Sequence, residues 1–113
     1  MRTHSKLHVL DDVLVAVEAL RPVVTKIRAH DKSLAAQLTD AASSMVLNIG
    51  EAAYSDPGNQ RARLSTASGS ANEARVALRL AAAWGYTGDE DTSEADARLD
   101  VVIAKLYRLL HRR

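Results

Sequence analysis

The sequence predicts an all-α protein, folded as a single antiparallel, up-down-up-down four-helix bundle. Its 113 residues suit one domain with one core, which we place at residues 1–113. Hydrophobic residues make up 47% of the chain but aromatic residues only 4%, and alanine is abundant, which favours helices over a β-sandwich or barrel. Apolar residues recur at alternating steps of three and four in segments joined by short connections, as in an up-down bundle.

The first two helices are expected over residues 7–29 and 32–53. Pro22 lies inside the first helix and is expected to kink it, because proline removes one backbone hydrogen bond. Asp31 or Ser33 is expected to cap the second helix. The expected buried stripe of the first helix is Leu10, Val13, Val17, Leu20, Val24 and Ile27. That of the second helix is Leu34, Leu38, Ala41, Met45, Asn48 and Ala52.

The last two helices are expected over residues 57–84 and 93–111. Asp56-Pro57 is a start signal, since aspartate is a preferred N-cap and proline fits the first helical turn. Gly85 suits the left-handed end of this helix, and Gly69 in its middle predicts a close crossing with another helix. Thr92 or Ser93 is expected to cap the fourth helix. The expected buried stripes are Leu64, Ala67, Ala71, Ala74, Leu78 and Ala81, then Leu99, Val102, Leu106 and Leu109.

Sequence patterns of the common enzyme classes are missing. The chain has no cysteine, which excludes a disulfide, a thiol nucleophile and a cysteine-based zinc site. A di-iron site in a bundle needs Glu-x-x-His pairs, and no glutamate here is followed by histidine three residues later. Nucleotide-binding glycine loops and the nucleophile-elbow motif are also absent. We therefore expect a non-enzymatic protein without a metal or other cofactor.

The uninterrupted apolar runs are short. The longest, residues 13–17 and 80–84, cannot cross a membrane as helices. The first residues also lack the apolar stretch of a signal peptide. We expect a cytoplasmic location and no membrane partner.

Polar residues line one side of the second and third predicted helices. Ser44, Asn48 and Glu51 share a stripe of the second helix, and Ser70 and Glu73 are three apart on the third. If these helices pack side by side, the five residues can form a hydrogen-bonded network that fixes their register. There are two alternatives to such a network: these residues contact a polar ligand or RNA, or they are simply exposed to solvent.

Three linked motifs in this region resemble those of a known family. Gln37-Leu38, Ala41–Ser44 and Asn48–Glu51 resemble, in order, a signature of the four-helix-bundle proteins encoded in intervening sequences of bacterial 23S rRNA genes. Ala67–Glu73 is similar to the Ala-x-Gly-Ser-x-x-Glu motif of that family. Trp84–Tyr86 resembles its Leu-Gly-Tyr helix end, with tryptophan in place of leucine. The resemblance covers roughly residues 34–86.

The resemblance implies a four-helix bundle that assembles into a homo-oligomeric ring, commonly a pentamer. A related group comprises accessory proteins of diversity-generating retroelements, which are basic pentameric barrels that bind nucleic acid and a reverse transcriptase. The resemblance therefore implies RNA, DNA or a protein as partner.

The charges sort to the two ends of the predicted bundle, although the net charge is only +1. An up-down topology places the chain start, the connection between the second and third helices and the chain end together. The basic residues expected there are Arg2, Lys6, Arg61, Arg63, Lys105, Arg108, Arg112 and Arg113, partly offset by Asp11, Asp12, Glu51 and Asp56. The opposite end carries Asp31, Asp89, Glu90, Asp91, Glu94 and Asp96, against Lys26, Arg28 and Lys32.

Two functional hypotheses follow from the charges. In the first, the basic end binds RNA or DNA, and the candidate contacts are Arg61, Arg63, Lys105, Arg108, Arg112 and Arg113. With only Tyr54 and Tyr107 as aromatic residues near this end, such binding should rest on phosphates and be weakly sequence-specific. In the second, the protein is an interaction or scaffold oligomer and the basic residues are a solvated tail. Ile103 and Leu110, which widen the apolar face of the fourth helix, are the expected contact between copies.

Overall fold

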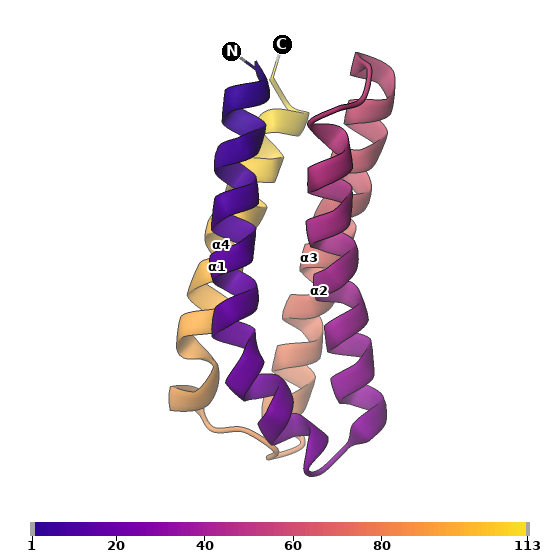
Figure 1. Cartoon of the computed structure of the whole chain (residues 1–113). Helices are drawn as coiled ribbons and strands as arrows, with labels where there is room; N and C mark the ends of the chain where they lie inside the picture. Colours follow the sequence, from indigo (N-terminus) through magenta and orange to yellow (C-terminus); the bar gives the residue numbers. More distant parts are fainter. Residues whose placement is uncertain (1, 113) are drawn as a thin grey trace.

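The computed structural model describes the backbone of residues 2–112 and the side chains of residues 8–112. These residues form four helices and no strand: α1 (Arg2–Arg28), α2 (Lys32–Ala52), α3 (Pro57–Ala83) and α4 (Asp89–Leu110). The helices lie side by side in an elongated bundle of 42 × 22 × 19 Å (Figure 1). The prediction of an all-α four-helix bundle is confirmed.

Each helix packs against its neighbours in the chain, and α4 also packs against α1. Figure 1 shows both chain termini and the α2–α3 connection (residues 53–56) at one end, which we call the terminal end. The connections at residues 29–31 and 84–88 lie at the opposite end, which we call the turn end. Two ion pairs join α1 to α4: Asp12 pairs with Lys105, and Lys26 pairs with Asp91. The fold therefore brings residues from the beginning, middle and end of the sequence together at the terminal end.

Local sequence signals set both ends of α3 and the start of α2. The Asp31 carboxylate accepts a hydrogen bond of 2.9 Å from the backbone N–H of Leu34 and caps α2. Asp56 caps α3 in the same way by accepting from the N–H of Asn59 at 2.9 Å. Gly85 follows α3 with a φ of 81°, a left-handed conformation that favours glycine. The predictions for these three positions are confirmed.

The fourth helix begins earlier than predicted, and the expected caps at Thr92 and Ser93 are wrong. Gly88 is the N-cap of α4, and its N–H donates to Asp91 Oδ2 over 2.7 Å. The Asp91 N–H in turn donates to the carbonyl of Gly88 at 3.0 Å. Acidic side chains are favourable in a first turn because they face the positive end of the helix dipole. Residues 89–91, which the sequence suggested were loop, therefore form that first turn.

The first helix starts at Arg2 rather than residue 7 and continues through Pro22 without a break. Its axis bends before the turn end in Figure 1. The buried stripe of α1 consists of Val9, Val13, Ala16, Leu20, Val23 and Ile27. Three predicted stripe positions, Leu10, Val17 and Val24, are only half-buried and pack at its flank. Two apolar stripes thus lie side by side on α1, and the packing of α2 and α4 decides which one enters the core.

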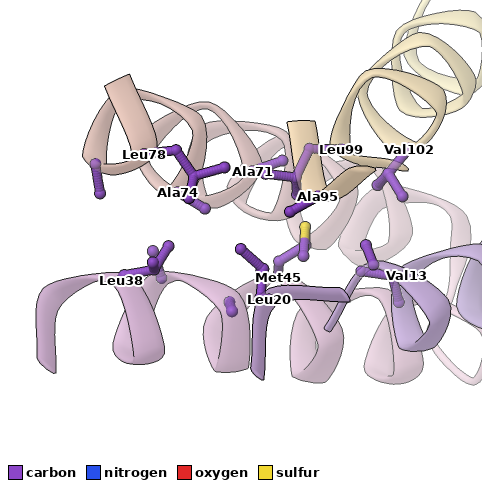
Figure 2. Packing of buried hydrophobic residues seen from close by; sticks show 14 of the residues in the cluster. Val13, Leu20, Leu38, Met45, Ala71, Ala74, Leu78, Ala95, Leu99 and Val102 are labelled. Carbon is purple, nitrogen blue, oxygen red and sulfur yellow. The ribbon is translucent and has the colours of Figure 1, made fainter. Parts of the chain in front are cut away.

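The core lies between two pairs of helices. In Figure 2, side chains from α1 and α2 face those from α3 and α4, and Met45 extends across the core toward Ala95. On α2, all predicted stripe residues are buried except Asn48, which is half-buried beside the fully buried Ile49. The predicted stripe of α3 is buried throughout, and on α4 only Leu109 is less than fully buried. The spacing of apolar residues therefore located the buried face of these three helices.

Gly69 is exposed in the middle of α3, so the close helix crossing predicted there is wrong. A Cβ atom added at this position would meet no heavy atom within 4 Å. Because glycine has more conformational freedom to lose than alanine, Gly69→Ala is expected to raise the free energy of unfolding by about 1 kcal/mol in urea titrations. Gly85→Ala is the contrasting control: its positive φ should make the same substitution destabilising. A loss of stability in Gly69→Ala would contradict the exposed position of this residue.

Among the described residues, none of the helices has both the length and the apolar character needed to span a membrane.

Candidate nucleic-acid interface

A chain of polar contacts joins α2 to α3, where the sequence predicted a network. The hydroxyls of Ser44 and Ser70 lie 2.8 Å apart across the two helices. The amide of Asn48 donates both to the carbonyl of Ser44 at 2.8 Å and to its hydroxyl at 3.2 Å. Arg63 then donates to Asn48 Oδ1 at 3.3 Å and pairs with Glu51 Oε1 at 3.0 Å. These contacts satisfy half-buried polar groups and link positions of the two helices that occur together in only one register.

The network differs from the prediction at two positions. Glu73 is exposed and makes no hydrogen bond or ion pair with any described side chain. Arg63, a predicted nucleic-acid contact, also links Asn48 to Glu51. The Ser44–Ser70 contact aligns α2 with α3, and this alignment places Arg63 opposite Asn48. The spacing of residues along one helix does not reveal how two helices are aligned.

Two of the predicted phosphate contacts, Lys105 and Arg63, form ion pairs with carboxylates of the protein. Lys105 Nζ lies 2.5 Å from Asp12 Oδ2, and both side chains are less than one-third exposed. Arg63 pairs with Glu51 as described above. The candidate contact Arg113 lies outside the described residues, as do the side chains of Arg2 and Lys6.

Three candidates, Arg61 on α3 and Arg108 and Arg112 on α4, remain exposed. Within the described side chains, none of the three makes an ion pair or hydrogen bond. A guanidinium without a carboxylate partner can offer all of its N–H donors to an incoming phosphate. We call these three residues the arginine patch.

The register of α3 and α4 places Arg61 on the side of α3 that faces α4. Arg75 on α3 forms ion pairs with both Asp96 and Asp100 on α4, which marks the flank where the two helices meet. Arg61 precedes Arg75 by two heptads, and a residue shifts by only ~20° per heptad around a straight helix. Arg61 therefore lies along the same flank, toward the terminal end. On α4, Tyr107 follows Asp100 by one heptad and lies on the facing flank.

An aromatic pair lies at the end of α4 beside the arginine patch. The rings of Tyr107 and His111 are stacked, with centroids 3.9 Å apart and planes inclined by 25°. Tyr107 is 60% exposed. On the wheel of α4, Arg108 and Arg112 lie ~100° and ~140° from Tyr107 on its solvent side. By the helical register, Tyr107 therefore lies on the α3 side of α4, and the two α4 arginines lie on its solvent side.

Acidic groups at the terminal end are held in place as carboxylates. Hydrogen bonds from the backbone and side-chain amides of Asn59 hold the pKa of Asp56 below its usual value. Together with Asp12 and Glu51, this charge offsets part of the basic end. Among the described residues of the terminal end, Arg61, Arg108 and Arg112 are cations that no ion pair offsets.

The turn end is acidic and held together by specific contacts. A hydrogen bond from Lys26, together with one from the Gly88 N–H, holds the pKa of Asp91 below its usual value. The ring of Tyr86 stacks on that of His30, with centroids 5.1 Å apart, and its hydroxyl donates to Asp31 at 3.3 Å. Trp84 stacks against Tyr86 at 6.4 Å. These rings join the two chain connections of the turn end.

Ile103 and Leu110, the predicted contact between copies, are half-buried and pack against the core. They therefore present less apolar surface than expected. More exposed apolar side chains lie on other helices: Leu47 on α2 is 64% exposed and Val76 on α3 is 63% exposed. A shallow groove between α1 and α2 is lined partly by Val17, Val24 and Ala42.

The 23S rRNA-intervening sequence protein family model matches residues 6–108, which is nearly the whole chain. The chain belongs to this family. The motif resemblance in α2 and α3 is thereby confirmed, and the match extends beyond those motifs into α1 and α4. For this 23S rRNA-intervening sequence protein, no match was found among the curated proteins or the solved structures. Among its described residues, no group of three or more His, Asp or Glu side chains is placed to hold a metal ion.

Proposed function

We propose that this family member is a non-enzymatic accessory protein that binds RNA or DNA phosphates through Arg61, Arg108 and Arg112. The observation that carries the proposal is that these three exposed arginines have no carboxylate partner among the described residues, at the end where Lys105 and Arg63 are paired. Phosphate backbones bind such groups by releasing condensed counterions, so affinity should fall steeply as salt rises. Membership of a family named for an intervening sequence of 23S rRNA supports RNA as the first ligand to test.

We further propose that the antiparallel bundle assembles into a ring. Exposed apolar side chains on several helices, including Leu47 and Val76, support an interface between copies. A ring would repeat the arginine patch around its axis, so that weak contacts act together on one long strand. A scaffold that binds a protein partner through the same apolar surface is the second candidate function, and it requires no affinity for RNA.

Reversing the charge of both α4 arginines, in Arg108→Glu/Arg112→Glu, is expected to weaken RNA binding by more than ten-fold at low salt. The reason is that two phosphate contacts are lost and two repulsive carboxylates are introduced. The measurement is a filter-binding titration of a generic structured RNA at two salt concentrations. Light scattering behind a sizing column should show an unchanged mass for the variant, because both arginines are exposed and neither forms an ion pair or hydrogen bond with another described side chain.

The matched control is Arg21→Glu/Arg28→Glu, which changes the net charge equally on two exposed arginines of α1 toward the turn end. It should retain most of the affinity. An equal loss in both variants would show that total charge, and not the arginine patch, governs binding. Undiminished affinity in the α4 variant would overturn the assignment and favour the scaffold function.

A further inference from the structure

The stacked Tyr107–His111 pair lies outside the buried core, and among the described residues no hydrogen bond or ion pair joins either side chain to another helix. We propose that this pair stacks an unpaired nucleobase, so that the preferred ligand is single-stranded nucleic acid and not a duplex. This inference rests on the proposed nucleic-acid function, and it specifies that the nucleic acid bound there is single-stranded.

The pair is built as a fixed platform. A backbone carbonyl only accepts hydrogen bonds, so the contact of 2.8 Å between His111 Nδ1 and the carbonyl of Tyr107 requires the proton on Nδ1. This bond and the ring contact at 3.9 Å orient both rings. Tyr107 nevertheless stays 60% exposed, so it has ring surface left for a third planar group.

The surrounding charges suit a strand that passes across the platform. Arg61 lies on the flank of α3 toward α4, nearer the terminal end than Tyr107, and Arg108 and Arg112 lie on the solvent side of α4, as the helical register shows. Phosphates on either side of a base can therefore contact arginines while the base contacts the ring. In a duplex the base faces are covered by their neighbours, so only the phosphate contacts would remain.

The two other exposed aromatic sites fit a base less well. Trp84 lies at the acidic turn end and already stacks on Tyr86, which in turn contacts His30. Tyr54 is 85% exposed but has no stacking partner among the described residues that would fix its ring. Among the described aromatic residues, Tyr107 alone combines a fixed, exposed ring with nearby arginines that have no described carboxylate partner.

The test compares a labelled single-stranded oligouridylate with an RNA duplex of the same number of phosphates, by fluorescence anisotropy at one fixed salt concentration. Tyr107→Ala is expected to weaken single-strand binding by about five-fold or more, the usual loss for one stacked base. Duplex binding should change by less than two-fold, because the arginines are intact. Tyr107→Phe keeps the ring and should bind like the unaltered protein. Tyr54→Ala is the matched control, and an unchanged circular dichroism spectrum verifies that each variant is folded.

The outcomes separate this inference from the proposed function. If neither RNA binds the unaltered protein at low salt, both proposals fail. If both RNAs bind and Tyr107→Ala weakens neither, nucleic-acid binding stands and base stacking on Tyr107 is overturned. Loss of single-strand affinity in Tyr54→Ala but not in Tyr107→Ala would also overturn it. Equal losses for single strand and duplex in Tyr107→Ala would reject the single-strand preference.

Discussion

Replacing Leu38 with alanine is expected to lower the free energy of unfolding by about 2–5 kcal/mol. Leu38 is fully buried on α2, and Figure 2 shows it facing the side chains of α3 across the core. The truncation removes apolar contacts and leaves a cavity that the surrounding helices fill only in part. Since domains of this kind are stable by roughly 5–15 kcal/mol in total, the midpoint of urea unfolding should fall markedly.

Leu47→Ala is the matched control, because it makes the same change on the same helix at a side chain that is 64% exposed. Its effect on an isolated bundle should stay within about 0.5 kcal/mol. A loss in Leu47→Ala that grows with protein concentration would show that another copy covers this side chain. If Leu38→Ala unfolds at the same urea concentration as the unaltered protein, the position of the core is wrong.

Enlarging Ala74 to leucine is expected to destabilise the bundle by about 1–3 kcal/mol. Ala74 is fully buried on α3, which makes its most extensive helix contact with α2. Alanines on this face let the two helix backbones approach closely, and a larger side chain would force them apart. The Ser44–Ser70 contact of 2.8 Å depends on that approach and should break as well.

Ala82→Leu serves as the control, because Ala82 lies on the same helix and is exposed. It should leave the unfolding midpoint nearly unchanged, whereas Ala74→Leu should lower it in a urea titration followed by circular dichroism. Equal stability of the two variants would mean that the α2–α3 interface tolerates an added side chain and is not closely packed.

The candidate site was only partly predictable from the sequence. The sorting of charges follows from the order of the helices, and it identified Arg61, Arg108 and Arg112. It did not show that Arg63 and Lys105 are paired, because their partners Glu51 and Asp12 belong to other helices. It also did not reveal the stacking of Tyr107 on His111, although the two residues are one helical turn apart. That spacing permits a ring contact but does not require it.

The sequence by itself determined where helices form and most of their ends. Capping by Asp31 and Asp56 and termination at Gly85 are contacts between residues close in the chain, so they can be inferred without a fold. The buried stripe of α3 was equally predictable, because its apolar residues keep one continuous spacing of three and four from Leu64 to Ala81.

Only the tertiary structure decided which surfaces meet. Either of two adjacent apolar stripes on α1 could have been buried, and the positions of α2 and α4 selected the one that contains Ala16. The same packing leaves Gly69 in solvent and Arg63 beside Asn48. The physical reason is that burial and ion pairing depend on distances between helices, whereas periodicity and capping depend only on neighbours along one helix.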